Sequence, residues 1–243
     1  MPQPQKIFIT LLCFIIVLSV NGQSKIGLNV GYTKPFMIST YDIPYSSGNV
    51  NYNGSFFIST SYKEKAGKKL FIGMSLSFNN YKLDFYEKNS IHYGLDESII
   101  DLKYNFNYLY LFIYPEMVFG NKLKFYINAG ISVGLLLNAT KSGLNIRART
   151  VEGSDGPYIE YTETEVEGNA KNDLKDFNLG GQLGMGLRYA ITDHWNMNID
   201  FSSRFLPFPV ESDFAKTQLD LLISVGVEYT IKRKKENNKK TAP

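Results

Sequence analysis

The stretch KLKFYINAGISVGLLLN, residues 122–138, decides the fold. From Leu123 to Leu137 every second side chain is apolar, and the positions between are mostly polar residues or glycine. This period of two is the pattern of a β-strand with one apolar and one polar face. Its 17 residues exceed the usual strand of about 5–6 residues and the about 9–11 that a transmembrane β-strand needs. The stretch therefore predicts a membrane-barrel strand with its apolar side facing lipid.

The same alternation recurs along the chain and predicts eight strands. They are expected at residues 26–33, 55–63, 69–85, 104–119, 122–138, 176–191, 195–204 and 217–231. The connections alternate long and short, which is the arrangement of outer-membrane barrels with long external loops and short periplasmic turns. The sequence thus predicts an all-β fold, an eight-stranded antiparallel up-and-down transmembrane β-barrel.

The alternation of connections also predicts an orientation. The short turns, at Gly67, Asn121 and Asp193, are expected in the periplasm. The long loops are expected outside the cell, near Ser46, Asn89, Asp155 and Ser212.

Residues 1–22 are interpreted as a cleaved signal peptide, followed by the barrel over residues 23–232. Lys6 is the only charge before the apolar run Ile7–Val20, which is short for a membrane-anchoring helix, the alternative for this segment. Cys13 lies in this run, so the exported chain has no thiol for a disulfide or a thiolate metal site. Residues 233–243 form a basic polar tail, expected to be a solvated end, with binding to acidic envelope polymers as the alternative.

The longest connection, residues 139–175, predicts an extracellular hairpin insertion near residues 144–170. Strand-like segments at 145–152 and 158–167 flank a Gly- and Pro-containing turn. Residues 144–175 carry seven acidic and four basic side chains. We therefore expect an acidic hairpin that stands above the barrel.

Six charged residues fall on the inward face of the predicted strands. They are Glu116, Lys124, Arg188, Asp200, Arg204 and Glu228. An eight-stranded barrel is just wide enough for side chains to fill it. We expect an interior polar network that plugs the lumen, with a polar conduit as the alternative.

Hairpin geometry predicts which of these charges meet. A turn centred on Gly120 places Glu116 opposite Lys124. A turn centred on Asp193 makes Asp200 a diagonal neighbour of Arg188. Glu228 is expected near enough to join them.

Candidate chemistry is sparse, because the chain has only two histidines. His92 lies near Ser90 in a predicted loop, so a membrane-embedded lipid hydrolase is the enzymatic alternative, but no third group is placed to orient the base. His194 lies in a predicted turn. No catalytic, cofactor-binding or metal-ligating residue is expected. The net charge of +3 does not indicate a nucleic-acid partner.

Three segments carry a resemblance to a known family: FYINAGISVGLLLNA (125–139), LGGQLGMGLRYAIT (179–192) and LDLLISVGVEYTI (219–231). Together with a signal that ends in Gly-Gln, they resemble the PorT-like outer-membrane β-barrel family of Bacteroidota. The resemblance implies an outer-membrane protein; the member that gives the family its name belongs to a secretion system. The acidic insertion and the basic tail depart from that pattern.

The sequence therefore predicts a non-catalytic integral outer-membrane protein that acts through its extracellular loops in binding, adhesion or envelope assembly. Outer-membrane lipid and an envelope or extracellular protein are the expected partners. The alternative is a secretion-system accessory or a narrow channel.

Overall fold

The computed structural model describes residues 23–38, 46–91, 96–154, 156–207 and 217–231. The expected signal peptide, the basic tail, His92, Asp155 and Ser212 lie outside the described residues. In the described part of the chain, no helix is long and apolar enough to cross a membrane.

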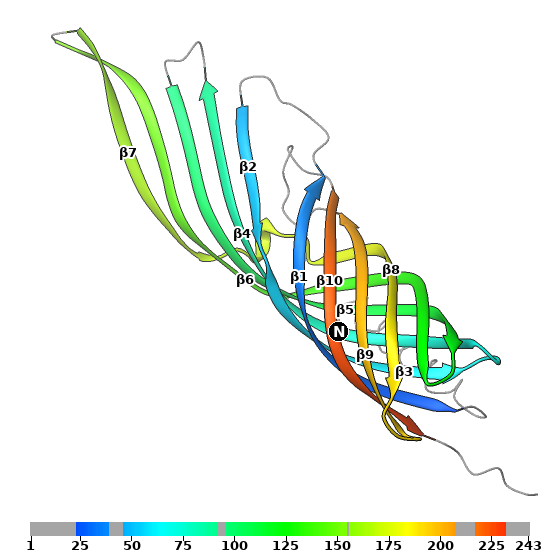
Figure 1. Cartoon of the computed structure of the whole chain (residues 1–243). Helices are drawn as coiled ribbons and strands as arrows, with labels where there is room; N and C mark the ends of the chain where they lie inside the picture. Colours follow the sequence, from blue (N-terminus) through cyan, green and yellow to red (C-terminus); the bar gives the residue numbers. More distant parts are fainter. Residues whose placement is uncertain (1–22, 39–45, 92–95, 155, 208–216, 232–243) are drawn as a thin grey trace, which may run out of the picture.

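Eight strands form a closed antiparallel ring (Figure 1). In ring order they are β1 (Ser24–Ile38), β3 (Ser55–Lys65), β4 (Leu70–Ile91), β5 (Asp96–Gly120), β6 (Leu123–Gly153), β8 (Phe177–Ala190), β9 (Trp195–Pro207) and β10 (Thr217–Ile231). Pairing of β1 with β10 closes the ring. Each ring strand therefore has a neighbour on both sides, and the predicted eight-stranded up-and-down barrel is confirmed.

The two faces of the ring differ as the alternation predicts. Ile131 and Leu183 on the outer surface are 60% and 56% exposed, whereas Ser132 is fully buried in the lumen. The ambiguous strand β5 also follows the prediction, because Tyr108 and Tyr110 are buried inside. A continuous apolar surface therefore surrounds the barrel where it meets lipid.

The predicted loop at residues 86–102 is wrong. Strand β4 continues to Ile91 and β5 begins at Asp96, and the two pair along the whole of this length. On one face of β5 the alternation persists, with Leu102, Tyr104 and Phe106 buried. The outward positions of this stretch are mostly polar, so apolar residues alternate on the inward face alone.

Two further strands join these extensions. The predicted loop at residues 35–53 contains β2 (Ser46–Asn53), which pairs with β4. The expected hairpin is present, formed by the far half of β6 and β7 (Gly156–Asn169) and followed by the 3-10 turn η1 (Lys171–Asp173). Strands β2-β4-β5-β6-β7 thus make an open five-stranded sheet, called the upper sheet, that rises beyond the ring (Figure 1).

The ring has two distinct ends, which we name by their connections. The turn end carries the short connections near Gly67, Asn121 and Asp193, and the loop end carries the upper sheet. A β-bulge between Asn107 and Tyr108 interrupts the β5–β6 register. Bulges bend strands and increase their twist, and this one lies where the ring gives way to the upper sheet.

The predicted register of the β5–β6 hairpin is wrong. Gly120 faces Lys124, so the loop centres on Lys122, and Glu116 faces Asn128 rather than Lys124. Gly120 has φ of +90°, a conformation that glycine adopts without the steric penalty of a side chain. This glycine permits the longer loop and shifts the register.

We expect Ile131→Arg and Leu183→Arg each to lower the free energy of unfolding by about 2–4 kcal/mol, because both place a charge against lipid. Urea titration of the protein folded in lipid vesicles measures this change. Ser142→Arg is the matched control, since Ser142 is exposed on the same outward face of β6 but lies in the upper sheet. Equal losses in Ile131→Arg and Ser142→Arg would show that the lipid boundary is misplaced.

Candidate functional site

Five charged side chains form a buried cluster near the turn end of the lumen, here called the basal ion cluster. The Glu116 carboxylate lies 2.7 Å from Lys63 Nζ and 2.9 Å from Arg188 Nη2. The Glu228 carboxylate lies 2.7 Å from Lys25 Nζ, 3.2 Å from Lys63 Nζ and 3.2 Å from Arg188 Nε. These residues come from β1, β3, β5, β8 and β10. The cluster therefore links five of the eight ring strands across the lumen.

Aromatic rings extend the basal ion cluster. The Arg188 guanidinium lies 4.4 Å from the centre of the Tyr126 ring, and Lys63 Nζ lies 5.3 Å from it. The Tyr126 hydroxyl donates to the Asp200 carboxylate. Asp200 thus reaches the cluster through Tyr126, and three carboxylates balance three cations in this part of the lumen.

A second buried group, the Arg204 cluster, lies nearer the loop end. Arg204 Nη2 is 2.7 Å from the Asp220 carboxylate and also donates to the Tyr81 hydroxyl at 2.7 Å. Tyr81 in turn donates to Asp220 at 2.7 Å. The Arg204 guanidinium lies 3.6 Å from the centre of the Tyr110 ring. This compact set leaves the guanidinium both paired and stacked.

The interior charges therefore form two clusters. Of the six residues predicted from sequence, Glu116, Arg188 and Glu228 meet directly in the basal ion cluster. The predicted Glu116–Lys124 contact is wrong, because Lys124 faces Gly120 and lies half-buried at the turn end. The expected approach of Asp200 to Arg188 is replaced by the contact through Tyr126.

Sequence reasoning missed Lys25, Lys63 and Asp220. Lys63 and Asp220 lie on the inward rows of predicted strands and could have been found there, whereas Lys25 lies one residue before its predicted strand and is found by extending the inward row. Lys25 lies two residues before Gly27 and four before Asn29, so it shares their inward face.

Between the two clusters lies a polar cavity of about 70 Å³. Serines and amides line it, among them Ser59, Ser75, Asn128, Gln182 and Ser202. A water molecule occupies about 30 Å³ in the liquid. The cavity has room for a few waters, and its lining includes Lys63 and Arg204 from the two clusters that flank it.

An apolar cluster closes the lumen at the loop end. Buried residues of β4 and β5, such as Tyr81, Leu83 and Phe106, pack with Leu174, which follows η1, and with Leu206 of β9. Lys141 Nζ pairs with Asp173 of η1 at 2.6 Å. The segment after β7 is thereby held over the inner face of the upper sheet.

On the outer surface, a row of asparagines separates the apolar band from the upper sheet. Asn80 Nδ2 lies 2.8 Å from the amide oxygens of both Asn105 and Asn107, and Asn107 Nδ2 lies 2.5 Å from that of Asn138. Below the row the outward residues are apolar, as at Phe78. Charged residues begin above it. The row therefore marks where the barrel surface leaves lipid on this side.

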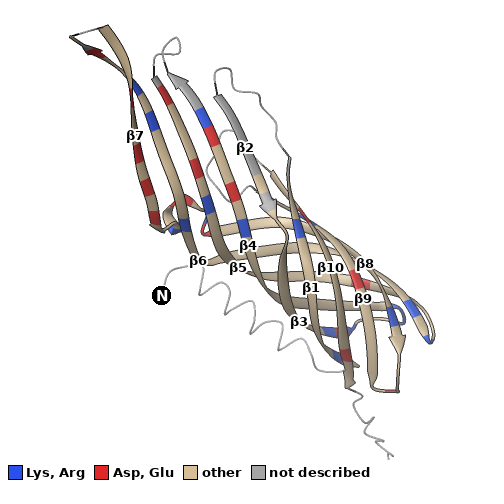
Figure 2. Cartoon of the chain, turned by 60° about the vertical axis from the view of Figure 1, so that its left-hand side comes forward, with Lys and Arg blue, Asp and Glu red and all other residues tan. Residues whose placement is uncertain are grey.

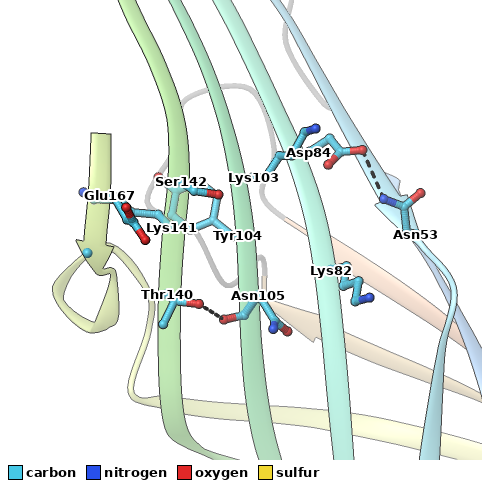
Figure 3. Close-up of a pocket in the computed structure, with 11 residues that line it drawn as sticks. Asn53, Lys82, Asp84, Lys103, Tyr104, Asn105, Thr140, Lys141, Ser142 and Glu167 are labelled. Carbon is cyan, nitrogen blue, oxygen red and sulfur yellow. Dashed lines mark hydrogen bonds between the residues drawn. The ribbon is translucent and has the colours of Figure 1, made fainter. Parts of the chain in front are cut away.

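Directly above the asparagine row, the outer face holds a shallow hollow of about 580 Å³ (Figure 3). Its lining includes Lys82, Asp84, Lys103 and Glu167, with charges of both signs. Asn53 Nδ2 donates to the Asp84 carboxylate at 3.0 Å, as the dashed line in Figure 3 shows. The hollow spans all five strands of the upper sheet, and most of its lining residues are polar or charged.

We expect Glu116→Gln to lower the free energy of unfolding by about 3–5 kcal/mol, because it leaves Lys63 and Arg188 buried with one carboxylate fewer. The temperature at which the folded band converts to the unfolded band in detergent gels reports this loss. Lys124→Gln is the control, since no ion pair to Lys124 is present among the described residues. A double Glu116→Lys/Lys124→Glu variant that regains stability would contradict the register.

The comparisons with known proteins agree with this architecture. The sequence profile of the outer membrane protein beta-barrel domain matches residues 21–205. No curated protein matches the chain.

Solved outer-membrane barrels are similar to the chain at low identity. OprG of Pseudomonas aeruginosa is 12% identical with a TM-score of 0.51, over 87% of this chain and 97% of OprG. Ail of Yersinia pestis, in complex with the heparin analogue sucrose octasulfate, is 10% identical with a TM-score of 0.44, over 87% of this chain and 100% of Ail. The protease OmpT of Escherichia coli is 11% identical with a TM-score of 0.43, over 88% of this chain and 97% of OmpT. The profile match covers most of the chain, and the protein therefore belongs to the outer membrane protein beta-barrel domain family and is an integral protein of the outer membrane.

Proposed function

We propose that this protein is a non-catalytic surface receptor or adhesin that binds an extracellular or envelope protein through its upper sheet. The proposal rests on a difference between the lumen of the ring and the upper sheet. Side chains fill the lumen, whereas the upper sheet extends beyond the apolar band and has two edges, on β2 and β7, that pair with no further strand among the described residues. Since long connections of such barrels are external, the upper sheet faces the outside of the cell.

The filled lumen argues against the narrow-channel alternative. A solute would have to pass the Arg204 cluster, a cavity of about 70 Å³ and the basal ion cluster in turn. Separating buried charge pairs is costly. Transport along the barrel axis is therefore a weaker proposal than binding at the loop end.

Strand β7 offers the more accessible edge. Among the described strands it pairs with β6 alone, so alternate backbone N–H and C=O groups point away from the sheet. Its side chains are exposed along almost the whole strand. An unpaired edge of this kind can accept an extended segment of another protein as an additional strand.

The charge of β7 indicates the kind of segment that fits. The strand carries Glu160, Glu163, Glu165 and Glu167 and no lysine or arginine (Figure 2). If β7 paired with β7 of a second copy, eight carboxylates would lie along one strand pair and repel each other. An extended segment rich in lysine or arginine is the complementary partner.

The contacts of His194 indicate a structural rather than a catalytic role for this residue. His194 Nδ1 lies 3.0 Å from the Thr230 carbonyl oxygen, and its ring stacks on Tyr229. These contacts give His194 a structural role at the turn end.

The resemblance to the PorT-like group adds envelope assembly to the roles that the upper sheet could serve.

The proposal is tested by shortening the hairpin without disturbing the ring. Ile146 and Glu163 face each other, so replacing residues 147–162 by Asn-Gly joins them through a two-residue turn. We expect the shortened protein to insert and fold normally. It should lose the protein partners that the full chain crosslinks on intact cells.

Exchanging Glu163 and Glu165 for glutamine is the finer variant, since it removes charge but keeps the strand. We expect it to weaken the same crosslinks, because charge complementarity is reduced. An unchanged set of crosslinked proteins in the shortened variant would contradict a role for the upper sheet.

A further inference from the structure

The lumen opens at the turn end into a hollow of about 560 Å³, here called the basal hollow. Most of its lining lies on the inward rows of the ring strands and of the turns between them. Its cationic lining residues are Lys25, Lys65, Lys68, Lys69 and Lys124, and its one carboxylate is Asp193.

Four of these lysines have no ion pair among the described residues. Lys65 and Lys124 lie on the inward rows of β3 and β6, and Lys68 and Lys69 lie at the β3–β4 turn. The Lys69 ammonium lies 5.7 Å from the centre of the Phe119 ring, which is its closest described interaction. Like charges around one hollow repel each other, so a bound anion would lower the energy of the arrangement.

Buried apolar residues line the inner end of the basal hollow. Phe71, Val118 and Tyr126 pack together beneath it. The basal ion cluster lies next to them and places Lys25, which also lines the hollow, Lys63 and Arg188 against the carboxylates of Glu116 and Glu228. A recess in a low-dielectric wall with cations on several sides concentrates positive potential.

The outward neighbours of these lysines meet lipid instead. Leu70 and Leu123 are 37% and 58% exposed on the outer surface of the same hairpins. The ammonium groups on the inward rows therefore face the aqueous mouth of the barrel. A ligand in this position approaches along the barrel axis from water.

We propose that the basal hollow binds the phosphate groups of a soluble anionic ligand on the periplasmic side. Lysine ammonium groups bind phosphate as point charges, and Thr192, Asn196 and Thr230 add neutral polar groups to the same lining. The volume admits a ligand with several phosphates. This site is independent of the upper sheet, which lies at the opposite end of the barrel.

The test uses tripolyphosphate as the probe and the full chain in nanodiscs of neutral phosphocholine lipid. Calorimetric titration at low salt should show saturable binding that weakens as salt is added. Lys65→Gln/Lys124→Gln should weaken this binding about 25-fold, since each lost charge contributes about fivefold. Lys82→Gln/Lys103→Gln, which removes the same charge at the loop end, should leave it unchanged.

Three outcomes would overturn the proposal. They are an absence of saturable binding, equal losses in the two double variants, and competition by anionic phospholipid. For the last, the titration is repeated in nanodiscs that contain phosphatidylglycerol. If phosphatidylglycerol competes with tripolyphosphate in the wild-type protein but not in Lys65→Gln/Lys124→Gln, the source of phosphate is a lipid headgroup rather than a soluble ligand. If the affinity for tripolyphosphate is the same with and without phosphatidylglycerol, the result supports the soluble ligand.

Discussion

Inside the lipid layer, every backbone N–H and C=O must find its hydrogen-bond partner within the protein, because water is absent there. The ring satisfies this constraint when β1 pairs with β10. Beyond the asparagine row the constraint no longer applies, since water can hydrate an open edge. The upper sheet accordingly ends in β2 and β7, each paired with one neighbour among the described strands. The edge of β7 is therefore free to add a partner strand without breaking a bond of the barrel.

The narrow ring also determines what the lumen can contain. Eight strands leave space for side chains and little else, so buried charges must pair with one another. Glu116 and Glu228 share Lys63 and Arg188 between them, and this sharing ties strands that are distant in sequence. We propose that function is located at the two ends of the barrel, which differ in charge. The hairpin at the loop end is acidic, and the basal hollow at the turn end is basic.

The alternation of side chains was sufficient to predict the ring and the facing of its strands, including β5. It failed at residues 86–102, because above the lipid boundary outward positions such as Asp101 become polar and only the inward row remains apolar. The Glu116 pairing failed for a local reason: Gly120 allows a loop centred on Lys122, which changes the register. The contact between Glu116 and Lys63 depends on how β3 and β5 meet across the lumen, and strand sequences alone do not specify that.

We propose that the lumen is closed and that the ends of the barrel carry the function. Single-protein conductance in planar lipid bilayers tests it most directly. The structure predicts that the folded wild-type protein shows no sustained conductance steps in salt solution, because two ion clusters and an apolar cluster fill the lumen. Regular ohmic steps from the wild-type protein would contradict the account and would make the lumen, rather than the upper sheet, the functional site.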